Sequence, residues 1–225
     1  MDLNANKFDF SLTRRNTYFE SILAKCVIIY NTICRTNTLI ANDENTIRNK
    51  FLEYLQNINF KMAQELKHLK FDKEIPERTG RVDIRVLPTK DEYINDEAYY
   101  IIECKRLDSN NLSGNTGLNA EYVKNGVCRF VTDYYSSYFG CNAMFGFVVE
   151  SVNIQTDIVD NINSMLTEDF TNAQGVQVNA NATQVMQYEK FVCGYPYSYI
   201  SKHTHISGKE IDLYHLMFDL SSNIQ

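Results

Sequence analysis

Two stretches of sequence decide the fold: GRVDIRV (residues 80–86) and YYIIECKRL (residues 99–107). In the first stretch, apolar residues alternate with Asp83 and Arg85, the period of two that is typical of a half-buried β-strand. The second is rich in Tyr and Ile, which favour strands, and the charged turn PTKDEYINDEA (residues 88–98) lies between the two. Together the two stretches predict a β-hairpin.

The predicted hairpin gathers charged side chains on one face. Residues two apart in a strand point the same way, so Glu103 and Lys105 share one face. Ile102 and Cys104 share the other face. Asp83 lies beside Glu103 if the two strands pair in register. We therefore expect two carboxylates and an ammonium group to converge at an edge of the sheet.

This grouping of charges predicts metal-assisted phosphate chemistry. Carboxylates at this density need a counter-charge in a partly buried site, and Mg²⁺ prefers carboxylate oxygens, water and phosphate as ligands. A metal ion activates water and neutralises charge on a scissile phosphate. Lys105 then orients the attacking water or stabilises the developing charge. An ion pair on a solvated strand is the alternative, and the apolar run IIEC (residues 101–104) disfavours it.

A helix that precedes the hairpin supplies a third acidic candidate. It is expected to begin near Asn42 or Asp43 and to continue through ENTIRNKFLEYLQN (residues 44–57). Glu44 lies on the same face as the apolar stripe of this helix, whereas Glu53 is about half a turn away and is expected to face water. The alternative for Glu44 is a carboxylate at a helix start, stabilised by the helix dipole.

Periodicity also predicts the remaining elements. The order of helices, hairpin, helix, strand, helix and hairpin implies a mixed sheet flanked by helices, and no linker divides the chain. The expected helices cover residues 12–35, 62–69, 120–140 and 156–170, the expected strand covers 143–152, the loops cover 108–119 and 172–184, and the terminal hairpin covers 195–220.

Composition narrows the function further. The 225 residues include 44% hydrophobic and 22% charged residues, which is typical of a globular chain. The net charge of −6 excludes a broad basic surface but not a local basic groove. Six cysteines without a C-x-x-C pair exclude a zinc ribbon and predict reduced thiols in a cytoplasmic protein. No apolar run approaches the roughly 18 residues that span a bilayer, so no membrane partner is expected.

The sequence resembles the PD-(D/E)xK nuclease superfamily. The resemblance rests on Asp83 in GRVDIRV, on Glu103-Cys104-Lys105 in YYIIECKRL, and on the order of helix, hairpin, helix and strand. It covers roughly residues 40–150, and Val82 stands where the family name implies Pro. The resemblance implies an α/β, restriction-endonuclease-like fold with a mixed central β-sheet flanked by α-helices.

The resemblance also divides the chain and implies an activity. Residues 1–225 would form a single domain, with an N-terminal helical extension (1–40), a catalytic core (41–150) and a helix plus terminal hairpin (151–225). The implied activity is that of an endonuclease, dependent on Mg²⁺ or Mn²⁺, that hydrolyses phosphodiester bonds, with DNA favoured over RNA. A role in restriction or phage defence, and a homodimer or a partner subunit, would accompany it.

The implied site comprises three groups of residues, of which the first two overlap. The catalytic group is Asp83, Glu103, Lys105 and Glu44. The metal ligands are Asp83, Glu103, Cys104 and Glu44. The nucleic-acid contacts are Arg106, Lys124, Arg129 and His203.

Several alternatives stay open at this stage. The chain is either a nuclease or a catalytically silent relative that binds nucleic acid or a partner protein. Glu74 and Glu77 are weaker ligand candidates, and Lys124 and Arg129 are either phosphate contacts or surface ion pairs. The H-x-H pair formed by His203 and a second histidine two residues later lacks the remaining ligands of a zinc set, so polar strand residues are favoured there.

Overall fold

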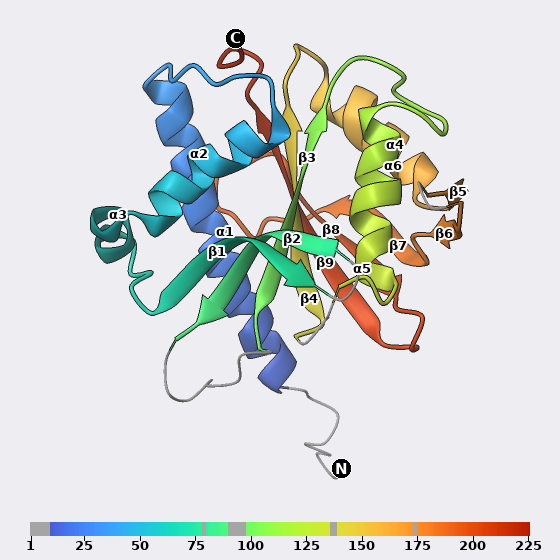
Figure 1. Cartoon of the computed structure of the whole chain (residues 1–225), viewed down its shortest axis with the longest axis horizontal. Helices are drawn as coiled ribbons and strands as arrows, with labels where there is room; N and C mark the ends of the chain where they lie inside the picture. The colour runs from blue at the N-terminus through green and yellow to red at the C-terminus, as the bar shows by residue number, and fades with distance from the viewer. Residues whose placement is uncertain (1–9, 78–79, 90–97, 136–138, 173–174) are drawn as a thin grey trace.

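The computed structural model describes residues 10–77, 80–89, 98–135, 139–172 and 175–225. They form a seven-stranded sheet with helices on both faces (Figure 1). Strands β3, β4 and β9 run parallel to one another and the other neighbours run antiparallel, so the sheet is mixed. The prediction of an α/β protein with a mixed central sheet flanked by helices is confirmed.

The order of strands in the sheet is β1-β2-β3-β4-β9-β8-β7, and β5 and β6 form a separate pair. The strands are β1 (Leu69–Glu77), β2 (Gly80–Pro88), β3 (Tyr100–Leu107), β4 (Cys141–Val148), β5 (Asp169–Thr171), β6 (Gln177–Asn179), β7 (Ala182–Tyr188), β8 (Ser198–Thr204) and β9 (Glu210–Asp219). The helices are α1 (Phe10–Arg35), α2 (Glu44–Gln56), α3 (Ile58–Ala63), α4 (Leu118–Tyr122), α5 (Cys128–Val131) and α6 (Asp160–Met165), with π-helical turns at Val123–Val127 and Ile154–Val159.

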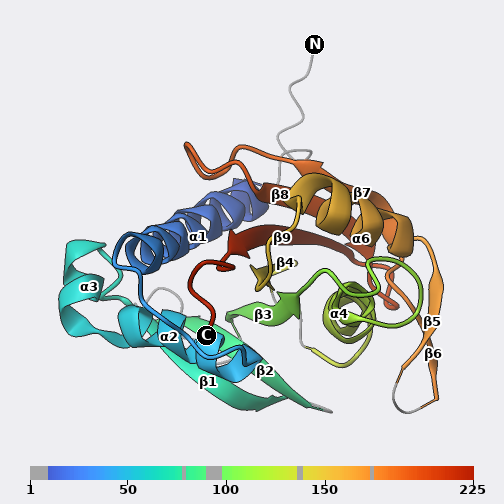
Figure 2. The same ribbon diagram turned by 90° about the horizontal axis from the view of Figure 1, so that it is seen from above.

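Two hydrophobic cores hold the layers together, one on each face of the sheet. Figure 2 shows α1 and α2 on one side of the sheet and α4 and α6 on the other. On the first side, Phe19 of α1 stacks on Tyr100 of β3 with 4.3 Å between ring centroids, so the N-terminal helix shares a core with the central strands. On the second side, Tyr122, Ile158 and Met144 of β4 belong to one buried cluster. No helix in the described ranges is long and apolar enough to cross a membrane.

Helix α2 forms as the sequence predicts. The Asp43 side chain accepts a hydrogen bond from the Thr46 amide at 2.8 Å and so caps the helix. Phe51 and Leu55 are fully buried, whereas the side chain of Glu53 is 64% exposed. The helix therefore presents its apolar stripe to the sheet, and Glu44 begins it.

The hairpin of β2 and β3 is also confirmed, and its two strands pair over only part of their length. Ile84 pairs with Ile102 and Val86 pairs with Tyr100. Most of the charged turn expected over residues 88–98 lies outside the described part of the chain, which omits residues 90–97. Beyond Ile102, β3 continues to Leu107 paired with β4, while its other edge has no further pairing with β2. This free edge of β3 is where the site forms.

Three expectations about local structure were wrong. The helix expected over residues 62–69 is absent, because α3 ends at Ala63 and Glu65 takes a left-handed backbone with φ +60°. The strand β1 follows instead. Residues 172–184, expected as a loop, contain β6 and the start of β7. The helix expected over 120–140 begins at Leu118 and ends at Val131.

Candidate active site

Along the free edge of β3, where pairing with β2 has ended, two side-chain carboxylates accept hydrogen bonds from the backbone amides. The Cys104 amide donates to Oδ2 of Asp83 at 2.8 Å, and the Arg106 amide donates to Oε2 of Glu44 at 3.0 Å. Amides two residues apart in a strand point to the same edge. The strand thus keeps its hydrogen bonds satisfied while two acids from different elements are drawn to one place.

The ammonium of Lys105 lies at the centre of this group. Its Nζ is 2.9 Å from Oε1 of Glu103 and 3.2 Å from Oε1 of Glu44, and it donates to the Cys104 carbonyl at 3.0 Å. Burial alone would lower the pKa of Lys105, but the carboxylates around it, Glu103 first, raise that pKa above its usual value. Lys105 is therefore a permanent cation that joins Glu44 and Glu103.

Glu103 is fully buried, and its charge is balanced from three sides. Besides Lys105, Arg129 Nη1 donates to its Oε1 at 2.7 Å, and the hydroxyl of Tyr135 donates to its Oε2 at 2.5 Å. Burial, with a smaller contribution from the charge of Asp83, raises the pKa of Glu103 to about 7 against the opposing effect of the two cations and the phenol. A carboxyl with this pKa changes charge near neutrality.

The side chain of Cys104 points away from the site, on the face that the sequence predicts for it. The thiol is fully buried in the core on the opposite face, together with Ile102, and burial raises its pKa well above the usual value. A thiol held protonated in an apolar core is a poor metal ligand. Cys104 faces the site through its main chain: its amide donates to Asp83 and its carbonyl accepts from Lys105.

Sequence reasoning missed Arg48, which holds Asp83. Arg48 Nη1 donates to Oδ1 of Asp83 at 3.1 Å, and its Nη2 donates to Oε1 of Glu74 at 3.3 Å. The Arg48 side chain is 3% exposed. The spacing of four residues from Glu44 puts both side chains on one helix face, but this spacing alone does not distinguish a buried arginine from an exposed one. Glu74 lies next to the site as a partner of Arg48, and the side chain of Glu77 is outside the described part of the structure.

Three of the four expected nucleic-acid contacts lie around the site. Arg129 is bound to Glu103 and lies over the ring of Tyr134, with 4.7 Å from its guanidinium carbon to the centroid. Lys124 pairs with Glu121 at 2.6 Å. Arg106 Nη1 donates to the carbonyl and the side-chain oxygen of Asn42 at 2.9 and 2.8 Å, which joins it to the loop before α2.

The fourth expected contact, His203, is a wrong prediction. Its ring is fully buried, and its Nδ1 donates to the Ala180 carbonyl at 2.7 Å while Nε2 meets the hydroxyl of Ser201 at 2.6 Å. A phosphate has no access to either nitrogen. The alternation of a strand places every second residue on one face, but it does not say which face is buried.

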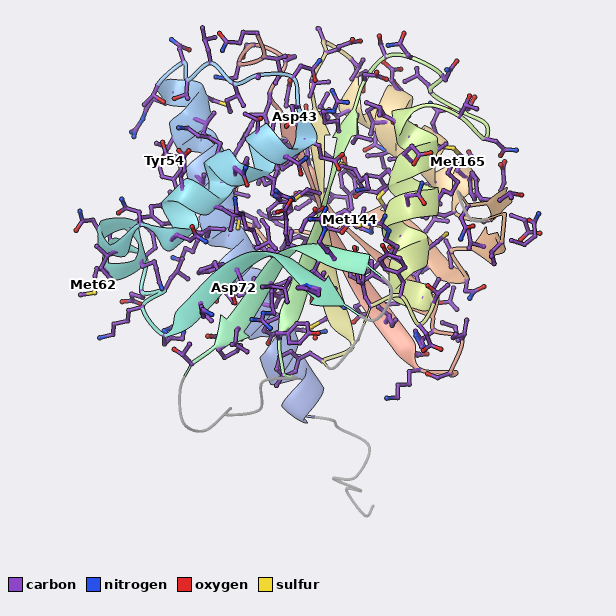
Figure 3. All side chains as sticks on the ribbon, viewed as in Figure 1. Asp43, Tyr54, Met62, Asp72, Met144 and Met165 are labelled. Carbon is purple, nitrogen blue, oxygen red and sulfur yellow. The ribbon has the colours of Figure 1, made fainter. Side chains whose placement is uncertain are left out.

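Two cavities meet at Lys105 and Arg129. A cavity of about 570 Å³ is lined by Arg48, Glu74 and Asp83 on the side of β2. A second, of about 360 Å³, extends along Lys124 and Arg106 on the side of α4 and α5. Glu44, Lys105, Arg129 and Tyr134 line both cavities. Figure 3 shows the side chains around this region, with Asp43 at the start of α2 and Met144 near the centre of the sheet.

The helix beside the second cavity contains a π-helical turn at Val123–Val127. Within this turn, a Cβ atom on Gly126 would lie 2.5 Å from Cε of Met144, so the absence of a side chain lets the helix approach the sheet closely. Turns of this kind are frequent at functional sites. This one lies between the elements that contain Tyr122 and Arg129, and it contains Lys124.

No protein-family model, no curated protein and no solved structure matches the chain. Within the described ranges, no three His, Cys, Asp or Glu side chains are grouped so as to hold a metal ion. The fold and the site therefore define a mixed α/β protein with a lysine-centred carboxylate site at the free edge of one strand.

Proposed function

We propose that this chain is a metal-dependent nuclease of restriction-endonuclease-like fold that hydrolyses phosphodiester bonds, with DNA favoured over RNA. One observation carries the proposal: Lys105 contacts Glu103 at the free edge of β3, where the Cys104 amide holds Asp83. These residue types in this grouping match the chemistry that the sequence predicts. The setting that we propose is cytoplasmic, in restriction or phage defence, with a homodimer or a partner subunit.

The donor atoms at the edge of β3 suit Mg²⁺ or Mn²⁺. These ions favour oxygen ligands, and Mg²⁺ is usually bound through one or two protein carboxylates together with water and substrate phosphate, so a cage of three acids is not required. Asp83, Glu103 and the Cys104 carbonyl would hold the ion, and Glu44 adds a fourth oxygen source nearby. When bound, the ion would neutralise phosphate charge and lower the pKa of a water molecule.

The residues of the chain then have separate roles. Lys105 is held charged by its acidic neighbours, so it is suited to orient a water molecule or to stabilise negative charge as it develops. Glu44 accepts from both the Lys105 ammonium and the Arg106 amide, so it fixes the position of the ammonium. Arg129 lines both cavities and offers a guanidinium to a phosphate.

The distribution of charge supports a polyanionic substrate. Over the whole chain, 28 acidic residues outnumber 22 basic ones. Around the two cavities the balance is reversed. The basic residues that line them are Arg48, Arg81, Lys105, Arg106, Lys124 and Arg129, and the acidic ones are Glu44, Glu74, Asp83 and Glu121. A local excess of cations in an acidic protein attracts phosphates to one place.

A second candidate function is a catalytically silent module that binds nucleic acid or a partner protein. The observation that favours it is the internal pairing of the acids: Asp83 is bound by Arg48, and Glu103 by Lys105 and Arg129. Such a set of ion pairs is stable without a metal ion. Thermal stability separates the two candidates, because a metal ion that binds only the folded chain raises the melting temperature.

The experiment that tests the nuclease proposal uses three substrates: plasmid, linear duplex and single-stranded DNA, each with Mg²⁺, Mn²⁺ or EDTA. We expect cleavage with either metal ion and none with EDTA. A parallel melting curve with the same ions reports binding independently of turnover. A chain that neither cleaves any substrate nor gains stability from either ion would overturn the proposal in favour of the silent module.

A further inference from the structure

Arg48 is an unusual residue for the interior of this protein. It lies on α2, its side chain is 3% exposed, and its Nε has no hydrogen-bond partner. A buried guanidinium is costly unless anions surround it. Here its two terminal nitrogens bind carboxylates from two different strands, Asp83 of β2 and Glu74 of β1. The contact is therefore a bridge between acids rather than a single ion pair.

The backbone places Glu74, the second carboxylate partner of Arg48, next to Asp83 in the sheet. Lys73 pairs with Ile84 and Ile75 pairs with Val82, so Glu74 lies opposite Asp83 in the register of β1 and β2. Glu74 has φ +50°, the left-handed region, in the middle of a strand. For a residue other than glycine this conformation costs on the order of 1 kcal/mol or more, and it persists only where surrounding contacts hold it.

We propose that Arg48 is a positioning residue that fixes the carboxylate of Asp83 at the free edge of β3. The guanidinium holds Oδ1 of Asp83 and is itself anchored by Glu74, so the other oxygen, Oδ2, faces the Cys104 amide. In its relation to metal binding this inference rests on the proposed function. The contact between Asp83 and Cys104 is independent of that function.

A positioning role of Arg48 and a purely electrostatic role predict opposite changes in metal affinity when Arg48 is replaced. Removing a cation beside Asp83 would, by charge alone, raise the affinity of the carboxylate for a divalent ion. Removing the group that orients a ligand lowers that affinity, typically by about 10- to 100-fold. Positioning therefore predicts that a neutral replacement of Arg48 weakens metal binding although the site becomes more negative.

The first measurement is a calorimetric titration of Mn²⁺ into the full chain. We expect Arg48→Met to lose about 10- to 100-fold in affinity. Arg48→Lys should lose less, since its ammonium keeps one charged donor although it does not replace the planar pair. Lys50→Met is the matched control, because Lys50 lies on the same helix and pairs with Glu53 at the surface. Equal or tighter Mn²⁺ binding by folded Arg48→Met would overturn the proposal.

The second measurement needs no metal ion. Hydrogen exchange of the Cys104 amide, followed by NMR, reports whether Asp83 stays in place. We expect faster exchange at Cys104 in Arg48→Met and in Glu74→Ala, with the neighbouring Phe145 amide of β4 as the control for overall folding. Glu74→Ala keeps the inference testable if Arg48→Met does not fold. Unchanged protection of Cys104 in a folded variant would contradict the proposal, whereas failure of the wild type to bind Mn²⁺ would count against the proposed function alone.

Discussion

The guanidinium of Arg129 on α5 donates to Oε1 of Glu103 on β3 at 2.7 Å. Glu103 is buried, so this pair neutralises a charge that water cannot reach. The same Arg129 lines both cavities, where a phosphate of the proposed substrate would compete with Glu103 for it. Arg129 therefore links the buried acid to the surface where a substrate is proposed to bind.

Nucleic-acid binding should depend on Arg129 without regard to sequence. We expect Arg129→Ala to weaken binding about equally for different sequences, as for a phosphate contact, and to reduce the slope of log affinity against log salt by about 1. Fluorescence anisotropy with Ca²⁺ in place of a cleavage-supporting ion measures both. Binding of the wild type should be weak without metal and only modestly salt-dependent. Tight metal-free binding with a steep salt slope would indicate a different binding surface.

Substitutions of the two acids of α2, Glu44 and Glu53, should have different effects on Mn²⁺ affinity and cleavage. Glu44→Gln is expected to lower Mn²⁺ affinity or cleavage, because Glu44 accepts from the Arg106 amide and from Lys105. Glu53→Gln should change neither, since Glu53 is exposed and pairs with Lys50. Calorimetry and a plasmid assay on both variants provide the comparison. Equal effects from the two substitutions would remove Glu44 from the site.

The main-chain contribution of Cys104 gives a third prediction. Cys104→Ala removes a thiol from the core and leaves the carbonyl at the edge of β3 in place. We expect a loss of about 1 kcal/mol in the free energy of unfolding, with unchanged Mn²⁺ affinity. Cys128→Ala, another buried thiol, serves as the control for packing. A selective loss of Mn²⁺ affinity in Cys104→Ala would instead identify the thiol as a ligand.

A buried chain of hydrogen bonds fixes two neutral histidines. Tyr122 donates to Nδ1 of His215 at 2.8 Å, Nε2 of His215 meets Ser201 at 2.7 Å, and Ser201 meets Nε2 of His203 at 2.6 Å. The Ala180 carbonyl accepts from the far nitrogen of His203. Because the Ala180 carbonyl can only accept, every hydrogen bond in this series has a fixed direction and each neutral imidazole has its proton on a fixed nitrogen. Burial lowers the pKa of His203 to about 4 and that of His215 well below its usual value.

Stability should therefore fall in mild acid. The unfolded histidines bind protons near pH 6.5 whereas the folded ones stay neutral, so their contribution is fully present above pH 6.5 and is lost as the pH falls toward 4. The slope is at most about 1.4 kcal/mol per pH unit for each histidine. Glu103 acts in the opposite direction, because its raised pKa favours the folded state more at low pH.

A comparison of variants isolates the histidine contribution. Urea unfolding of the wild type and of His203→Gln between pH 7.5 and 5 is the measurement. We expect the wild type to lose stability over this range more steeply than His203→Gln, although the variant is less stable at pH 7.5. Parallel curves for the two proteins would mean that His203 is not the titrating group.

Strong periodicity explains which parts of the fold could be predicted. Helix α2, the hairpin of β2 and β3, and the buried strand β4 each have an unambiguous apolar pattern, and the structure contains all of them. Strand β1 was missed because LKFDKEIPE contains several charges and a proline, and it lies at the edge of the sheet. Strand β7 was missed for a similar reason, since most of its side chains are not fully buried.

The site was predictable where spacing alone determines it. Glu103 and Lys105 share a face because they are two residues apart, and the hairpin register brings Asp83 to the same edge. Arg48 was missed because an arginine on a helix normally faces water, and only the tertiary contact with Asp83 shows otherwise. The assignment of His203 failed because alternation did not show which face of β8 is buried.

The most direct test of the central claim is cleavage of plasmid DNA with Mn²⁺ by the wild type and by Glu103→Gln, each shown to be folded by its melting curve. Glu103 is the acid that contacts both Lys105 and Arg129. The nuclease account predicts cleavage by the wild type and none by the folded variant. Full activity in folded Glu103→Gln would contradict it.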